Sequence, residues 1–254
     1  MSDCPACGCE HAIFRLKVVN GFSIRKCHQC SLEFCAPMPA AEEIAVCYKS
    51  FYDHVSSLET MRLNARRNLD YLAEKWGMRQ TAKALDYGCG ENVFAIVANG
   101  AFFRVFGFDP IRPPPGPFTV NSIVGKWDWI TLWGVLEHLT DPLGTLAGLR
   151  AELAPGGRIA LTTVSMETGI PYQHIPPIHA LYFTRTAIEA LAGRAGFKVL
   201  EYRNYEMEID SDMYLSILLR TVPEPYRLQI FHTLPDYVEV PTNEVFVVLE
   251  RDDL

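Results

Sequence analysis

The first thirty residues contain two C-x2-C pairs, Cys4–Cys7 and Cys27–Cys30, with nineteen residues between them. Each pair places two thiolates on one tight turn. Two such pairs supply the four sulfurs of a tetrahedral zinc site and leave no coordination position open. The spacing therefore predicts a structural zinc site at Cys4, Cys7, Cys27 and Cys30. Two disulfides, or four thiols without a ligand, are the alternatives.

The residues between the two pairs have the pattern of a β-hairpin. Residues 12–19 and 22–26 are rich in strand-forming side chains, and Asn20-Gly21 between them is a strong turn signal. Gly8 follows the first pair, where the backbone often needs a positive φ. A hairpin between two cysteine pairs is the outline of a zinc ribbon, which we place at residues 1–36.

The position of the cysteines also bears on the compartment. Five of the eight cysteines lie in the first 30 residues, and the N-terminus lacks the basic start and apolar core of a secretory signal. Cysteines in a chain without an export signal favour metal binding over disulfides. No run of about 18 apolar residues is present, so no membrane span is predicted. We expect a cytoplasmic protein that does not associate with membranes.

The charge balance disfavours nucleic acid as a partner. The formal net charge is −7. Residues 1–36 carry four basic and three acidic side chains, and the remainder carries 19 basic and 27 acidic ones. Four thiolates on one zinc would make the ribbon more negative still. Neither part has the basic surface that phosphate backbones require.

From residue 82 onward the chain alternates between strand-like and helix-like segments. Such alternation is typical of an α/β protein in which helices cover both faces of a parallel sheet. The predicted strands lie at residues 83–87, 103–109, 129–133, 158–164, 197–202 and 245–250, and predicted helices at 93–98 and 184–195. Thr184 is the expected N-cap of the last helix.

Two features at the ends of the first two of these strands indicate a ligand site. Gly88-Cys89-Gly90 lies at a strand-to-helix turn, where glycines let the backbone approach a ligand closely. Asp109 ends the next strand, nineteen residues after Gly90. An acidic residue there can accept hydrogen bonds from both hydroxyls of a ribose. The alternative is a glycine turn and a loop aspartate that bind nothing.

With these motifs in order, residues 60–200 resemble the class I S-adenosylmethionine-dependent methyltransferases. The most similar members are ubiquinone-type O-methyltransferases and the sugar or natural-product methyltransferases that share the Leu-Glu-His-x-x-Asp-Pro string. Some bacterial sugar methyltransferases also carry an N-terminal cysteine zinc module. The matching stretches are residues 85–90, 105–109, 127–142, 153–159, 179–184 and 195–197.

The resemblance implies a fold, a cofactor and positions for it. The fold is a Rossmann-like, doubly wound, mainly parallel seven-stranded sheet at residues 81–254, after a linker and helical lead-in at 37–80. S-adenosylmethionine is the implied cofactor. Its methionine part would face Asp86 and the backbone from Gly88 to Gly90. Asp109 would hold the ribose, and Trp133 would lie against the cofactor.

This sequence departs from the family pattern at three places. Asn92 stands where a third glycine is usual, and asparagine tolerates left-handed backbone better than most residues. Only eighteen residues separate Asp109 from Asp128, where the family usually fits a helix and a strand. This proline-rich loop leaves the adenine contact unassigned. Gly134 replaces a carboxylate thought to serve a catalytic metal in ubiquinone-type enzymes, so the resemblance does not extend to a catalytic magnesium.

Three histidines are candidates for the acceptor side of the site. A hydroxyl acceptor needs a base, and the imidazole of histidine suits that role near neutral pH. His138 follows the predicted fourth strand, whereas His174 and His179 lie in the proline- and aromatic-rich segment after the fifth. In the family that segment forms part of the acceptor pocket, which Tyr172, Tyr182 and Tyr205 could also line. The alternative for His138 is a structural histidine that bonds the loop at Thr140-Asp141, and that for His179 is a contact with Tyr182-Phe183 at the entry of the next helix. For the tyrosines the alternative is ordinary packing.

These observations predict methyl transfer from S-adenosylmethionine to a small molecule such as a sugar, a natural product or a quinone. Two other functions are open at this stage. One is a methyltransferase acting on RNA or protein, with the ribbon as docking module. The other is a non-catalytic binding protein with this fold, which Asn92 and the shortened middle would favour.

Overall fold

We analysed a computed structural model, which describes residues 3–10, 13–52, 57–111, 114–170, 173–211 and 235–253. Its helices are α1 (Ala41–Tyr52), α2 (Leu58–Trp76), α3 (Val93–Gly100), the short 3-10 helix η1 (Leu136–His138), α4 (Pro142–Glu152) and α5 (Arg185–Arg194). Its strands are β1 (Ile13–Val19), β2 (Phe22–Cys27), β3 (Glu33–Cys35), β4 (Lys83–Tyr87), β5 (Arg104–Phe108), β6 (Trp127–Trp133), β7 (Leu153–Val164), β8 (Leu181–Tyr182), β9 (Phe197–Asp210) and β10 (Tyr237–Arg251).

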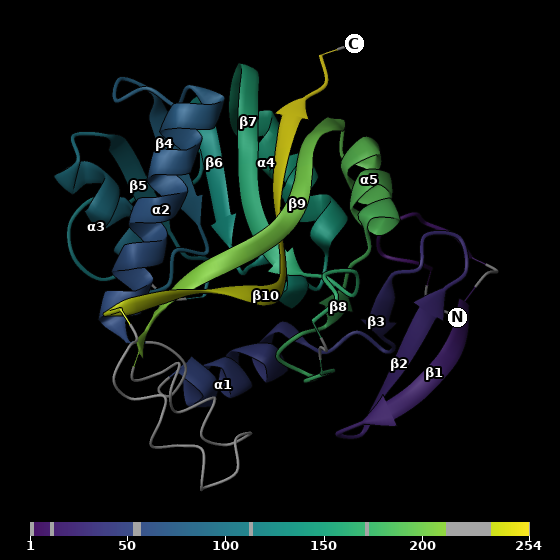
Figure 1. Cartoon of the computed structure of the whole chain (residues 1–254). Coiled ribbons are helices and arrows are strands. Elements are labelled where there is room, and N and C mark those ends of the chain that lie inside the picture. The colour runs from purple at the N-terminus through teal and green to yellow at the C-terminus, as the bar shows by residue number, and fades with distance from the viewer. Residues whose placement is uncertain are drawn as a thin grey trace, which may run out of the picture.

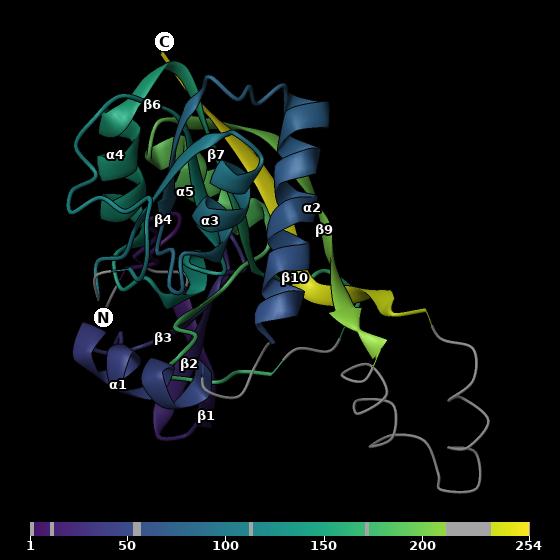
Figure 2. The same cartoon turned by 90° about the vertical axis from the view of Figure 1, so that its left-hand side faces the viewer.

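The main sheet has the order β5-β4-β6-β7-β10-β9 (Figure 1). Strands β5, β4, β6 and β7 are parallel, whereas β10 runs antiparallel to both of its neighbours. Figure 2 shows α2 and α3 on one face and α4 and α5 on the other. The predicted doubly wound, mainly parallel α/β fold is therefore confirmed.

The described part of the chain forms six strands in this sheet instead of the seven expected. The difference lies beyond β5, at the edge of the sheet. There Gly107 makes a single parallel bridge with Thr119, and its N–H donates to Phe118 O at 2.8 Å. The prolines at 114, 115 and 117 lack the N–H that a sheet ladder needs, so the short connection supplies only this bridge.

A second sheet has the order β1-β2-β3-β8. The predicted hairpin is confirmed, with the turn at Asn20 and Gly21, whose φ values are 49° and 83°. Strand β8, which lies some 150 residues later in the chain, was not expected in this sheet. It pairs antiparallel with β3 through Phe34–Leu181 and Glu33–Tyr182. The ribbon is thus joined to the segment that precedes α5, and the expected division at residues 36 and 80 stays a prediction.

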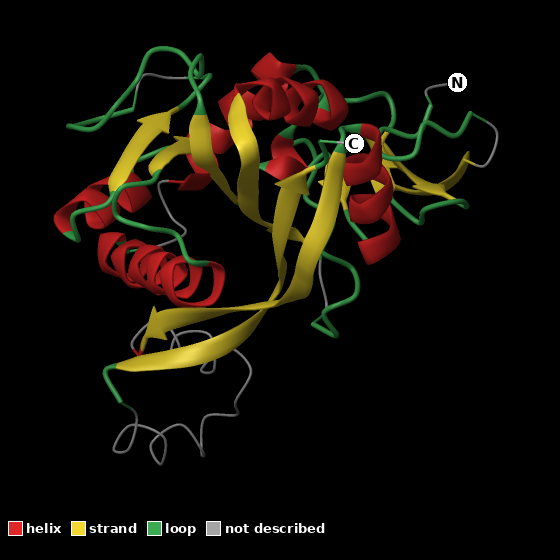
Figure 3. Ribbon diagram, turned by 90° about the horizontal axis from the view of Figure 1, so that it is seen from above, coloured by secondary structure: helices red, strands yellow, loops and turns green. Residues whose placement is uncertain are grey.

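The buried side chains form one large cluster on each face of the main sheet. The α4–α5 face packs Leu146, Leu149 and Leu191 together with ribbon residues Leu32 and Phe34. The α2–α3 face packs residues such as Leu69, Leu72 and Phe94. Seen from above, β9 and β10 continue past the helices as a long two-stranded arm (Figure 3). None of the described helices is both long and apolar enough to cross a membrane.

Candidate active site

A cavity of about 430 Å³ opens at the carboxyl ends of β4 and β6. Ligands of open α/β sheets bind at this edge. Side chains from α2, from the turn after β4, from η1 and from the β9–β10 arm enclose it. The lining residues are Thr60, Met61, Asn64, Ala65, Asn68, Asp86, Gly88, Cys89, Gly90, Glu91, Val93, Phe94, Trp133, Gly134, Glu137, His138, Thr162, His179, Tyr205, Met207 and Glu244.

The turn after β4 forms one wall of this cavity. Gly88 and Gly90 have φ values of 72° and 49°, and Gly88 N–H donates to Phe108 O of β5 at 2.7 Å. A Cβ on Gly88 would lie 2.8 Å from a methyl carbon of Val135, so this position excludes any side chain. The predicted glycine turn therefore presents bare backbone to the cavity.

Asp86 lies beneath that turn and is 2% exposed. Its Oδ1 accepts a hydrogen bond from the Thr131 hydroxyl at 2.7 Å. Burial, with the charge of Asp109 as a smaller cause, raises the pKa of Asp86 to about 7. A carboxyl group held near neutrality can exchange a proton or accept an ammonium group.

Asp109 follows β5 and lies beside the glycine turn. Its carboxylate accepts hydrogen bonds from Gly90 N–H at 3.2 Å and from Ile111 N–H at 2.8 Å. It is not part of the cavity lining. The structure thus brings Asp109 next to Gly90, at the rim of the cavity, and its contact with a ribose stays a prediction.

Asn92 adopts the left-handed conformation expected of it, with φ 59°. The side chain is fully buried, and its Nδ2 donates to Pro117 O at 2.8 Å and to Pro115 O at 3.3 Å. Opposite it, a Cβ on Gly107 would lie 2.0 Å from Asn92 Oδ1. Asn92 therefore holds the proline-rich loop to the start of α3, which a glycine could not do.

Trp133, at the end of β6, forms an apolar wall of the cavity. Its ring meets Phe94 edge to face at 5.1 Å and stacks on Phe246 at 6.2 Å. The indole Nε1 is buried and has no hydrogen-bond partner among the described residues. Trp133 thus faces the cavity and its indole N–H is available to a ligand, while its packing on the cofactor stays a prediction.

His138 and His179 both line the cavity, and their ring centroids lie 4.9 Å apart. His138 Nδ1 is 2.6 Å from Ile178 O. Burial lowers the pKa of His138 to about 4. Burial, followed by the charge of His138, lowers the pKa of His179 to about 3. Both imidazoles are therefore neutral at pH 7.

The third predicted histidine is not brought to this site. His174 is buried outside the cavity lining, and its Nε2 lies 2.7 Å from Glu33 Oε2 on the ribbon. Of the tyrosines, Tyr205 lines the cavity and Tyr182 does not. Tyr172 lies outside the described residues.

Three cavity carboxylates, Glu91, Glu137 and Glu244, were missed in the sequence. Glu137 accepts from the Thr163 hydroxyl at 2.8 Å, and burial raises its pKa to about 7. Burial, and then the charge of Glu137, raises the pKa of Glu244 to about 7. Glu137 belongs to the Leu-Glu-His string of the family pattern, which could have indicated it. Glu244 lies on β10, and no motif around it indicates a site residue. Donor atoms of Glu137, His138 and His179 lie within 4.8 Å of one another, a spacing that could hold a metal ion.

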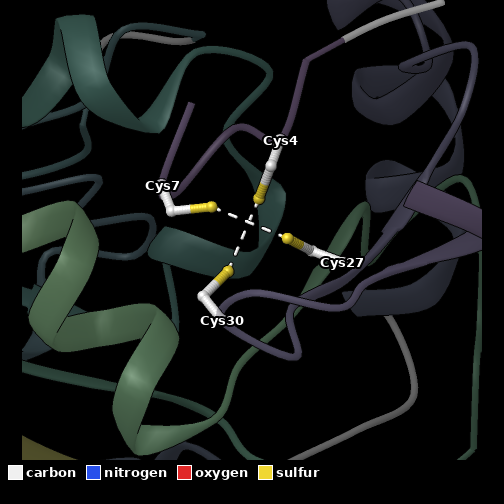
Figure 4. A group of neighbouring side chains, drawn as sticks. All are labelled: Cys4, Cys7, Cys27 and Cys30. Carbon is white, nitrogen blue, oxygen red and sulfur yellow. Dashed lines mark hydrogen bonds between the residues drawn. The ribbon is translucent and has the colours of Figure 1, made fainter. Parts of the chain in front are cut away.

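The four predicted cysteine ligands converge on one point (Figure 4). Cys4 Sγ lies 3.5 Å from Cys30 Sγ, and Cys7 Sγ lies 3.6 Å from Cys27 Sγ. All four sulfurs lie within 4.8 Å of one another. A tetrahedral zinc site with Zn–S bonds of ~2.3 Å separates its sulfurs by roughly 3.8 Å, so this donor set has the right chemistry and size for zinc.

The family profile described as "Methyltransferase domain" matches residues 57–202. The chain belongs to the class I S-adenosylmethionine-dependent methyltransferase family. A curated relative is the ubiquinone biosynthesis O-methyltransferase of Aeromonas salmonicida, which is 24% identical over 119 residues. That match covers 38% of this chain and 49% of the relative, so the chain spans about half of the relative's length.

Two solved methyltransferases illustrate the structural likeness. One is the 1,6-didemethyltoxoflavin-N1-methyltransferase of Burkholderia thailandensis, with bound 1,6-didemethyltoxoflavin and S-adenosylhomocysteine. It is 17% identical, covers 94% of this chain and 99% of its own, and has a TM-score of 0.55. The other is the magnesium protoporphyrin IX methyltransferase of Synechocystis, which is 12% identical, covers 76% and 84%, and has a TM-score of 0.47. At such identities the first comparison establishes a shared methyltransferase fold.

Proposed function

We propose that this methyltransferase transfers a methyl group from S-adenosylmethionine to a small-molecule acceptor. The observation that carries the proposal is the single cavity that joins the glycine turn after β4 to the neutral pair His138 and His179. One end offers bare backbone and a buried carboxyl group. The other offers imidazoles for an acceptor. One named relative is an O-methyltransferase of ubiquinone biosynthesis, and one solved methyltransferase has 1,6-didemethyltoxoflavin bound, which supports a small acceptor.

We place the methionine part of the cofactor at Asp86 and the Gly88–Gly90 backbone, the ribose at Asp109, and an apolar face against Trp133. S-adenosylmethionine supplies a methyl group on a positively charged sulfonium. The cavity suits that charge, because its described lining contains Asp86, Glu91, Glu137 and Glu244 and no lysine or arginine. This arrangement also disfavours an acceptor that presents a phosphate or carboxylate at the reacting end.

On the acceptor side we assign His179, with His138 against its ring, to receive the proton that the acceptor loses. Methyl transfer is an in-line displacement, so the chain mainly has to orient two groups and exclude water. The lowered pKa of His179 keeps its imidazole unprotonated and able to accept a proton from a hydroxyl or an amine, although burial makes it a weaker base than a solvent-exposed imidazole. His174, paired with Glu33 outside the cavity, is better suited to positioning the segment that carries His179.

The test is calorimetry with S-adenosylmethionine and S-adenosylhomocysteine, followed by methyl-transfer assays on panels of sugars, quinols and small heterocycles. We expect micromolar binding of both and labelled product from one panel. No binding below roughly millimolar would instead support a non-catalytic protein of this fold. Labelling of bulk RNA or protein, with none of small molecules, would support the macromolecular alternative.

A further inference from the structure

The zinc ribbon is bonded to both ends of α5. Thr184, the N-cap of α5, donates its hydroxyl to Cys30 O at 2.7 Å and accepts from Ala187 N–H at 3.1 Å. At the other end of the helix, Arg194 donates to Ala6 O at 2.8 Å, within the first cysteine pair. Gly8 has a φ of 74°, which favours glycine, and a Cβ there would lie 3.1 Å from the Arg194 guanidinium, closer than an ordinary contact. Each cysteine pair thus contacts one end of the same helix.

The ribbon also holds the strand that follows His179. Strand β3 begins three residues after Cys30 and pairs with β8. Next to this pairing, Cys35 N–H donates to Ala180 O at 2.9 Å, while Ala180 N–H donates to Glu137 O at 2.9 Å. Ala180 therefore links the ribbon directly to η1, and His179 precedes it in the chain.

Three further contacts fix the segment that ends at His179. The Tyr182 hydroxyl donates to His179 O at 2.9 Å and accepts from Ile175 N–H at 2.8 Å. His174 Nε2 lies 2.7 Å from Glu33 Oε2, and both side chains are at most 7% exposed. Burying such a pair costs free energy unless its geometry is well defined, so the contact favours one placement of the loop on the ribbon.

The cofactor end of the cavity is organised differently. The N–H groups of Gly88 and Gly90 donate to Phe108 O and Asp109 Oδ2, both at the end of β5. Strand β5 lies at the opposite edge of the main sheet from α5 and the ribbon (Figure 1). The two ends of one cavity thus depend on different parts of the fold.

We infer that the Cys4–Cys7–Cys27–Cys30 centre is a positioning site for the acceptor side of the cavity, which sets the placement of His179 through β3, β8 and the start of α5. Loss of zinc, by chelation or thiol oxidation, would then disable the acceptor side while cofactor binding persists. The inference rests on the proposed function because that function identifies the His179 end of the cavity as the acceptor side. The contacts between the ribbon and the His179 segment do not depend on it.

The test compares zinc-loaded full-length protein with protein treated with a chelator, by hydrogen exchange, histidine modification and S-adenosylhomocysteine calorimetry. On zinc removal we expect amides of residues 180–183 to exchange at least tenfold faster. Diethyl pyrocarbonate should modify His179 at least fivefold faster. Exchange at residues 86–90 and S-adenosylhomocysteine affinity should change less than threefold.

A pair of variants tests the same link with zinc in place. Thr184→Val removes the hydroxyl bonded to Cys30 O, and Thr184→Ser retains it. We expect both to keep one zinc per chain, and only Thr184→Val to raise exchange at residues 180–183.

Three results would overturn the inference: unchanged β8 exchange in protein shown to be zinc-free, an equal rise at residues 86–90, or less than half an equivalent of zinc in the untreated protein. Failure of zinc-loaded wild type to bind S-adenosylhomocysteine would overturn the proposed function instead, while the exchange data still decide the positioning role.

Discussion

The imidazoles of His138 and His179 meet edge to face, with centroids 4.9 Å apart, although they come from η1 and from the loop before β8. His138 lies in η1, which follows β6 of the main sheet, whereas His179 precedes β8, which pairs with β3 of the ribbon. It places two neutral nitrogen bases beside a buried carboxyl group, Glu137. This is the part of the cavity in which an acceptor would lose a proton.

His179→Ala is expected to lower turnover of the true acceptor by ~10²–10⁴, the usual contribution of a general base. S-adenosylhomocysteine affinity should stay within about threefold, which is ~0.7 kcal/mol. Initial rates and calorimetry check the two halves separately. His28→Ala, at an exposed histidine of the ribbon, is the matched control. Full activity of His179→Ala would reduce the residue to packing, and loss of cofactor binding would move it to the cofactor side.

Asp109→Ala is expected to weaken S-adenosylmethionine binding by about a hundredfold or more. Two charge-assisted hydrogen bonds to a ribose are each worth about 1.5–3 kcal/mol. Because Asp109 also accepts from Gly90 N–H, part of the loss would come through the glycine turn. Calorimetry measures the change, and Asp128→Ala at the other end of the sheet serves as control. Unchanged affinity would mean that the ribose lies elsewhere.

Purified protein is expected to contain one zinc per chain. Cys27→Ser should lose it and destabilise the ribbon, because a closed four-cysteine site contributes folding free energy when loaded. Cys47→Ser on α1, outside the centre, should retain the metal. Elemental analysis decides, and less than about half an equivalent in wild type prepared without chelator would contradict the prediction.

Local signals explain which features could be predicted from the sequence. The cysteine spacing, Asn20-Gly21, the glycine turn and the cap at Thr184 are each set by a few adjacent residues, and the structure places them as expected. Asn92 stands where the family usually has a glycine and tolerates left-handed backbone, and the structure shows that conformation there. The turn and cap residues among them have conformational preferences that their own side chains set.

The features that escaped prediction are all non-local. Strand β8 is two residues long and pairs with β3 across the length of the chain, so no periodic pattern marks it. Glu244 lines the cavity from β10, but in the sequence it is only a polar residue directly before the strand predicted at 245–250. His174 was predicted to lie in the pocket because it belongs to the segment after the fifth strand. Its partner Glu33 is 141 positions away, so no local pattern indicates their contact. Each of these outcomes is decided by which segments the sheets bring together.

Asn92→Ala is expected to destabilise the protein by about 2–5 kcal/mol. Alanine in the left-handed region costs about 1–2 kcal/mol, and each lost hydrogen bond to the proline-rich loop adds about 0.5–1.5 kcal/mol. Asn92→Gly also removes the two hydrogen bonds, but glycine adopts left-handed backbone without strain. It should therefore lower the free energy of unfolding less than Asn92→Ala does. Urea unfolding of both variants checks this order. Equal costs would mean that the left-handed backbone contributes nothing.

Glu137→Gln is expected to make stability less dependent on pH. Burial raises the folded-state pKa of Glu137 to about 7, above its ordinary 4.5, so the folded protein binds this proton more tightly than the unfolded chain. Its contribution is therefore full below about pH 4.5 and is lost as the pH rises through about 7. Glutamine has no such proton and can still accept from the Thr163 hydroxyl.

Urea unfolding at pH 5 and pH 8 measures this effect. Asp86, whose pKa is also about 7, gives wild type and variant the same background slope. Glu244 does not, because the charge of Glu137 contributes to its raised pKa, so the difference between the two proteins measures Glu137 together with its effect on Glu244. The drop in unfolding free energy between the two pH values should be smaller in Glu137→Gln by about 2–3 kcal/mol. Glu189→Gln, at an exposed position of α5, should match wild type. A drop as large as that of wild type in Glu137→Gln would mean that this carboxyl is already ionised at pH 5, and that the acceptor end of the cavity carries a fixed negative charge.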